Sequence, residues 1–136
     1  MLYFTAVVTI LLVTFVFVYF ASGEENAGNI EFLENYGWQV DKNAIETEEI
    51  TIPENFDKVY ERYNDLQKEA GLDLEPYKGK TAKRYTYIVK NYPHEVLEEV
   101  RANVLTVDGK CIAGDIMTVG TAGFMHSLLY TDAKLY

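Results

Sequence analysis

The sequence predicts an α+β domain in which a mostly antiparallel sheet of about four strands carries two helices on one face, behind an N-terminal transmembrane helix. Three observations support this prediction. Residues 2–21 form an uncharged apolar run, residues 53–70 carry apolar side chains at helical spacing, and residues 81–119 alternate in the way that strands do.

The apolar run at residues 2–21 contains no charged side chain. A helix rising about 1.5 Å per residue would make it roughly 30 Å long, which matches the hydrocarbon core of a bilayer. A cleaved signal peptide usually has a basic start and a shorter apolar run. We therefore expect residues 1–22 to be a single-pass signal anchor in the cell membrane, with the acidic flank Glu24 and Glu25 outside. Secretion after cleavage near Gly23 is the alternative.

The remainder of the chain is long enough for one modest core. We expect residues 23–28 to be a tether and residues 29–136 to form one extracytoplasmic α+β domain. Its first elements are a short helix over residues 29–36, ended by Gly37, and a short strand over residues 48–52.

The clearest predicted helix covers residues 53–70. Pro53 suits a first helical position, where its missing N–H is not needed, and Gly71 suits the position after the last turn. Large apolar residues recur every three or four positions, which indicates one face packed on a core. These residues are Phe56, Val59, Tyr60, Tyr63, Leu66 and Ala70.

Three strands are predicted after this helix. The first is residues 81–91, and the other two form a hairpin over residues 98–119 around the turn Asp108-Gly109. A regular two-residue turn would place Leu105 opposite Ile112 and would put Asp115 on the face that packs against the helices. The other members of that face would be Val100, Ala102, Val104, Cys111, Ala113 and Met117.

Composition and motifs argue against several classes of function. The net charge of −9 disfavours a nucleic-acid protein, because phosphate contacts require a positive surface. Cys111 could act as a nucleophile with His126 and Asp115, but Cys111 and Asp115 are too far apart along one strand to touch. His94 and His126 have no metal-ligand spacing. We therefore predict no enzyme, no catalytic residue, no metal site and no cofactor.

A basic stretch stands out in this acidic chain and lies between two loop tyrosines. It could bind an anionic partner, such as a wall polymer or an envelope protein, or it could pair internally with Glu46, Glu48 and Glu49. The binding surface predicted on the first of these interpretations comprises Tyr77, Lys78, Lys80, Lys83, Arg84 and Tyr92.

Several segments together resemble an uncharacterised family of small membrane-anchored or secreted proteins from Gram-positive, clostridial-type bacteria, known only as a domain of unknown function. They are FLENYGW at residues 32–38, IPENFDKVYERYNDLQ at residues 52–67, YKGKTAKRYTYIVKNYP at residues 77–93, VRANVLTVDGK at residues 100–110 and GFMHSLL at residues 123–129. The resemblance implies an extracytoplasmic α+β domain and no known activity. We expect a non-catalytic binding or regulatory module of the cell envelope; the alternatives are a cell-wall hydrolase and an inhibitor of an envelope protease.

Overall fold

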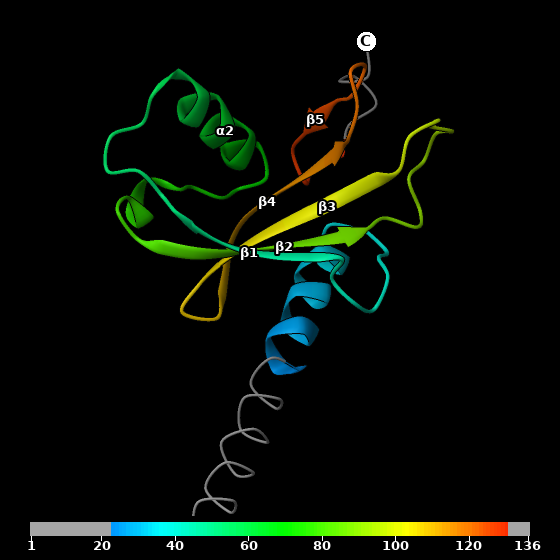
Figure 1. Cartoon of the computed structure of the whole chain (residues 1–136), viewed down its shortest axis with the longest axis horizontal. Coiled ribbons are helices and arrows are strands. Elements are labelled where there is room, and N and C mark those ends of the chain that lie inside the picture. The colour runs from blue at the N-terminus through cyan, green and yellow to red at the C-terminus, as the bar shows by residue number, and fades with distance from the viewer. Residues whose placement is uncertain (1–22, 131–136) are drawn as a thin grey trace, which may run out of the picture.

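The computed structural model describes residues 23–130, and its centre is an antiparallel sheet of five strands (Figure 1). The strands lie side by side in the order in which they occur in the sequence. Their bounds are Glu46–Thr51 for β1, Thr81–Ile88 for β2, Val100–Val107 for β3, Lys110–Thr118 for β4 and Met125–His126 for β5.

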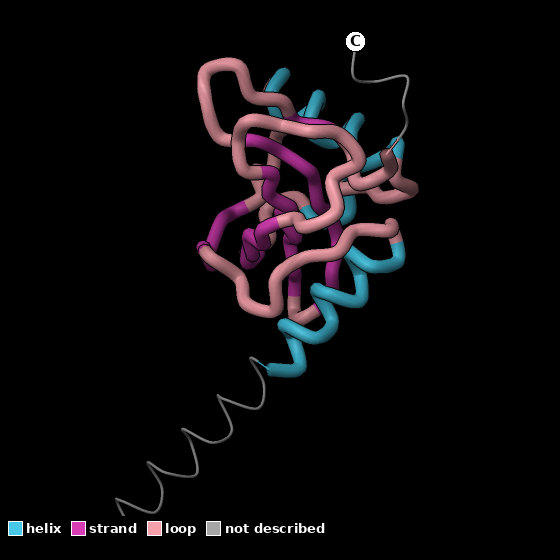
Figure 2. Tube along the Cα trace, turned by 90° about the vertical axis from the view of Figure 1, so that its right-hand side faces the viewer, coloured by secondary structure: helices cyan, strands magenta, loops and turns pink. Residues whose placement is uncertain are grey.

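Helices lie on both sides of this sheet. Residues 23–35 form an N-terminal helix, and Lys58–Glu69 form α2; Figure 1 shows them on opposite sides of the strands. In Figure 2, the N-terminal helix runs alongside the strands, on one side of the sheet. A short 3₁₀ helix, η1, covers Glu75–Tyr77.

The predicted arrangement was wrong in two respects. The sheet has five strands rather than four, because the short β5 pairs with the end of β4 through Ile116 and His126. The two helices do not share a face. The reason is visible in β2, where Tyr85, Thr86 and Tyr87 are all buried, so both sides of that strand need cover.

The predicted transmembrane helix finds no support in the structure. None of the helices within residues 23–130 combines the length and apolar character needed to cross a bilayer. The apolar run at residues 2–21 lies outside the described residues. Residues 23–28, expected to be a tether, instead form the first turns of the N-terminal helix.

The side of the sheet under the N-terminal helix is densely packed, and we call it the closed face. Leu33 of the helix and Trp38 just after it are buried there against the sheet. Trp38 also donates from Nε1 to the carbonyl of Leu128 at 2.7 Å. The sheet residues of the closed face are Tyr85, Tyr87, Val89, Val100, Ala102, Val104 and Ile116.

The second helix begins later than predicted. Its N-cap is Asp57, whose side chain accepts from the backbone N–H of Tyr60 at 2.9 Å. Pro53 therefore lies before the helix rather than at its first position. The predicted stop is confirmed, because Gly71 follows with a φ of +78° that other residues rarely adopt.

The hairpin turn is confirmed, but its register is not. Asp108 and Gly109 both have positive φ, at 50° and 76°. Beyond the turn, however, an irregularity between Leu105 and Thr106 shifts the pairing, so Leu105 lies opposite Ala113 rather than Ile112. One extra residue in β4 moves every later side chain to the other face. Asp115 consequently lies opposite Asn103, on the α2 side of the sheet.

Candidate binding cavity

A cavity of about 560 Å³ lies between α2 and the sheet. Every strand contributes at least one side chain to its lining, so it crosses the sheet over four strand spacings, roughly 19 Å at about 4.8 Å each. Its volume is within the usual range for small-molecule sites. The lining residues are Ile50, Val59, Tyr60, Arg62, Tyr63, Leu66, Arg84, Asn103, Leu105, Asp115, Met117 and Met125.

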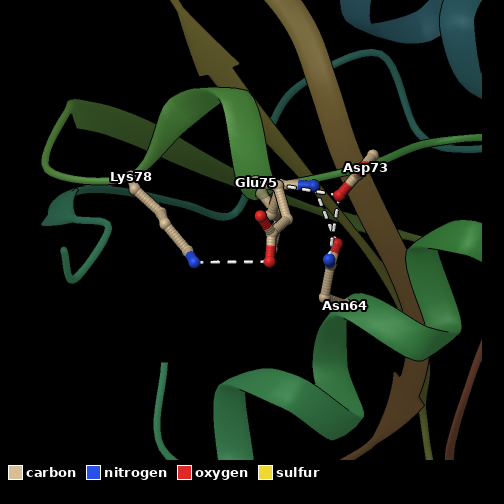
Figure 3. A network of polar contacts seen from close by, with 5 residues as sticks. Asn64, Asp73, Glu75 and Lys78 are labelled. Carbon is tan, nitrogen blue, oxygen red and sulfur yellow. Dashed lines mark hydrogen bonds and ion pairs between the residues drawn. The ribbon is translucent and has the colours of Figure 1, made fainter. Parts of the chain in front are cut away.

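Polar side chains fasten α2 to its surroundings beside this cavity. Asn64 and Gln67 are the buried residues of the helix. Gln67 Oε1 accepts from the backbone N–H of Gly114 at 2.9 Å, and Asn64 Oδ1 accepts from the backbone N–H of Leu74 at 2.7 Å. Asn64 Nδ2 also donates to Asp73 at 2.9 Å, in the network shown in Figure 3.

The predicted apolar stripe is only partly core, because Phe56 and Tyr63 pack against the buried cluster around Ile52 and Leu74. Val59 is 71% exposed, while Tyr60, Tyr63 and Leu66 are only partly buried. All four line the cavity. The helical apolar stripe therefore borders both a packed cluster and a hollow.

Asp115 forms the polar floor of the cavity and is only 2% exposed. Its Oδ2 accepts from the Tyr63 hydroxyl at 2.7 Å, and its Oδ1 accepts from Asn103 Nδ2 at 2.9 Å. Asn103 is held in turn by Thr86, whose hydroxyl donates to its Oδ1 at 2.7 Å. This chain fixes the carboxyl group in one orientation.

Burial raises the pKa of Asp115, while its hydrogen bonds from Asn103 and Tyr63 and the charge of Arg84 act in the opposite direction. Burial and the neighbouring Asp115 raise the pKa of Tyr63 well above its ordinary value. The Tyr63 hydroxyl therefore stays protonated at neutral pH and serves as a donor.

Two arginines line the same cavity. Arg84 Nη2 bonds to Glu48 and lies 3.9 Å from Glu46, both on the neighbouring edge strand. Its Nε is buried and has no hydrogen-bond partner among the described residues. Arg62 lines the cavity from α2, is exposed, and forms no ion pair within residues 23–130.

The six residues of the predicted binding surface do not share one surface. Arg84 faces the cavity, whereas its neighbour Lys83 points to the other side of β2, where Nζ lies 3.6 Å from Glu25. Tyr92 lies at the far end of the closed face, with its ring stacked on Trp38 at 5.8 Å. The internal pairing of Arg84 with glutamates matches the alternative interpretation of the basic stretch.

The remaining three predicted residues lie at the end of η1 and just after it. Tyr77 packs against the cluster that contains Ile52 and Leu74. Lys78 lies 3.3 Å from Glu75 and 4.6 Å from the centre of the Phe56 ring, and Lys80 is exposed. A binding role for these residues stays a prediction.

The three candidate catalytic residues are separated by the sheet. Asp115 faces α2, whereas the Cys111 thiol donates to Asn29 on the N-terminal helix at 3.2 Å. Burial raises the pKa of Cys111 to about 11, which keeps the thiol protonated. His126 Nε2 lies 2.9 Å from the hydroxyl of Tyr92. The geometry brings no nucleophile together with a base in this set.

Histidine, cysteine and carboxylate side chains do not gather into a metal-binding group anywhere in residues 23–130. Sequence reasoning also missed several lining residues, among them Asn103, Leu105 and Met125. Only the register shift of the hairpin places Asn103 and Asp115 on the cavity side together, and no residue in the sequence signals that shift.

Comparison with known proteins gives a family and no function. No curated protein and no solved structure matches the chain. The model of one family, described as a domain of unknown function, DUF4830, matches residues 32–116. That match covers more than half of the chain and includes Arg84, Asn103 and Asp115 of the cavity. The chain belongs to the DUF4830 family, which agrees with the predicted resemblance to a domain of unknown function; the predicted bacterial source and membrane anchoring stay predictions.

Proposed function

We propose that this protein is a non-catalytic binding module of the cell envelope, and that the cavity between α2 and the sheet is its binding site. One observation carries the proposal. The cavity is walled largely by apolar and aromatic side chains, with a few polar groups held in fixed positions at its floor. This combination is typical of sites that bind small molecules, where apolar walls supply affinity and a few polar groups fix orientation.

The burial pattern supports the same proposal. Val59 and Met125 are 71% and 48% exposed at the cavity, and they stand beside the partly buried Tyr60 and Leu66. Apolar side chains that remain accessible next to a hollow gain free energy when a ligand covers them, by roughly 25 cal/mol for each Å² removed from water. A ligand would thus bury apolar side chains of the cavity that are still accessible to water.

The envelope location rests on the sequence. The uncharged apolar run at residues 2–21 is the kind of segment that directs export, and the acidic charge of the chain disfavours a nucleic-acid partner. A binding role rather than catalysis is supported by the separation of Cys111 from Asp115 on opposite faces. Fractionation with protease treatment of intact cells tests the location.

Methionine methyl groups give a direct test of the site. The chain has three methionines, of which Met117 and Met125 line the cavity, whereas Met1 lies outside the described residues. We expect decanol, added to the full-length chain with ¹³C-labelled methionine methyls, to shift the signals of Met117 and Met125 in a saturable manner.

A filled cavity provides the control. Val59→Trp puts a large ring at an exposed wall position and should abolish the saturable shift, whereas Leu97→Trp adds the same ring at a fully exposed loop position and should leave it unchanged. Equal shifts in both variants, or no saturable shift in the natural chain, would contradict the proposed site.

A further inference from the structure

The charged side chains of the cavity are unevenly distributed along its length, and this bears on what it binds. Arg84 comes from β2, near the β1 end, whereas Met117 and Met125 come from β4 and β5 at the other end. Leu105 and Leu66 also line the cavity. The lining therefore has a cation on the β2 side and two methionines on the β4 and β5 side, with Asp115 of β4 on the floor.

Among the lining residues, the buried polar atom without a hydrogen-bond partner within residues 23–130 belongs to Arg84, on the cationic side. Both oxygens of Asp115 already accept a hydrogen bond, from Tyr63 and from Asn103. Arg84, by contrast, uses only Nη2, and its Nε is buried without a partner among the described residues. A buried donor without a partner costs free energy, so an acceptor that reached it would be favoured.

A second cation stands beside the cavity. Arg62 projects from α2, in line with Val59 and Leu66 on the helix face that lines the cavity, and none of the ion pairs in residues 23–130 involves it. Glu46 and Glu48, which partly offset Arg84, are about half exposed, with side-chain accessibilities of 52% and 49%. Their charges are therefore screened by water more than a charge inside the cavity would be.

We propose that the ligand of this cavity is an apolar chain ending in a carboxylate, with the carboxylate at Arg84 and Arg62 and the chain extending toward Met117 and Met125. Planar guanidinium groups match carboxylates in geometry, and charge-assisted hydrogen bonds are about twice as strong as neutral ones. The apolar length of the cavity suits a single unbranched chain. A peptide would bring backbone N–H and C=O groups that these walls could not satisfy.

This inference rests on the proposed binding site. Three ligands of equal chain length test the site and the head group separately. Decanoate, decanol and decylamine differ only in their head groups, and each would be titrated below its micelle-forming concentration into the full-length chain with labelled methionine methyls. Decanoate should bind about tenfold more tightly than decanol, because one charged hydrogen-bonded contact is worth that much. Decylamine should bind most weakly.

Matched variants locate the head group. Arg84→Met should weaken decanoate about tenfold and leave decanol within about twofold, because only the charged contact is removed. Lys83→Met removes the same charge from the adjacent residue, whose side chain faces the other side of β2, and should change neither affinity. Arg62→Met should weaken decanoate by about twofold to threefold, as an exposed contact does. That variant also preserves the test if Arg84→Met does not fold.

The outcomes are distinguishable. Equal affinities for decanoate and decanol, or tightest binding of decylamine, would overturn the carboxylate assignment and leave the binding cavity in place; the second result would assign the head group to Asp115. Absence of saturable binding by all three ligands would overturn both proposals. Loss of decanoate affinity in Lys83→Met equal to that in Arg84→Met would show that only the overall charge of the protein matters.

Discussion

On one face of the sheet, the N-terminal helix brings Leu33 and Trp38 onto Tyr87 and Ile116, and all four side chains are at most 3% exposed. On the other face, α2 places Val59, Tyr60, Tyr63 and Leu66 over the strands without closing the space beneath them. The same five strands thus support a packed core on one side, and a smaller buried cluster beside a cavity on the other.

The difference arises from what each helix buries. The N-terminal helix inserts the apolar Leu33, together with Asn29, which donates to the hydroxyl of Tyr87 at 3.1 Å. The second helix inserts Asn64 and Gln67, which bond to backbone groups and set its distance from the sheet. Directional hydrogen bonds hold a helix at a fixed position, whereas apolar contacts favour the closest approach that the shapes allow. A hollow under a helix can therefore be stable.

The largest expected loss of stability comes from a variant in the closed face. Leu33→Ala should lower the free energy of unfolding by about 2–5 kcal/mol, because Leu33 is fully buried and its neighbours cannot collapse into the space. Denaturant unfolding monitored through Trp38 would measure this change. A loss below about 1 kcal/mol would show that this face is not closely packed.

A second variant tests how tightly the closed face is packed against the strands. A Cβ added at Gly114 would lie 2.7 Å from the carbonyl oxygen of Asn103 and 2.8 Å from Leu128 Cδ1. Because one of these atoms belongs to the backbone of the paired strand, Gly114→Ala should destabilise the protein by about 1–3 kcal/mol. Gly28→Ala, where nothing lies within 4 Å of the added Cβ, is the control and should not be destabilising. Equal stabilities of the two variants would contradict the packing described here.

The cavity face should tolerate truncation better. Leu66→Ala removes the same atoms as Leu33→Ala, but Leu66 is only partly buried and already borders a hollow. We expect a loss of less than about 1.5 kcal/mol, the low end of the free energy for burying a leucine side chain. The same unfolding measurement applies, and a loss equal to that of Leu33→Ala would remove the distinction between the two faces.

Asp115 on the cavity face should make the stability of the protein depend on pH. Burial raises its folded-state pKa, so its ionisation favours the unfolded chain. The stability that protonated Asp115 contributes to the folded state is fully present below about pH 3.8, its pKa in the unfolded chain. It is lost as the pH rises through the folded-state pKa. The natural chain should therefore lose stability relative to Asp115→Asn as the pH rises from 4 toward neutrality.

Unfolding of both proteins across that range measures the effect. A difference that stays constant with pH, or that changes in the opposite direction, would show that hydrogen bonds from Tyr63 and Asn103 outweigh burial at this carboxyl group.

Much of the fold could be predicted from local patterns. Alternation in β2, the Asp-Gly turn and the glycine stop of α2 each depend on a few neighbouring residues, and each is present in the structure. The predicted strand at residues 48–52 corresponds to β1, which begins at Glu46. The fifth strand has only two residues, which is too short for any periodicity to appear.

The cavity could not be predicted in the same way. It depends on one extra residue in β4, which turns Asp115 from the closed face to the other side, and on Asn64 and Gln67, polar residues that a hydrophobic pattern assigns to solvent. From the sequence, Arg84 was predicted to belong to a basic binding surface because of its charge. The structure assigns it to the cavity because side chains alternate along a strand and Lys83 takes the opposite face.

The most direct test of the contrast between the two faces is a crystal structure of the protein under xenon pressure. Xenon occupies apolar cavities without needing any polar group, so its position reports empty apolar space alone. We predict a xenon site between α2 and the sheet, beside Leu66, Leu105 and Met117, and none between the N-terminal helix and the sheet. Xenon under the N-terminal helix, or α2 packed onto the strands with no xenon beneath it, would contradict this account.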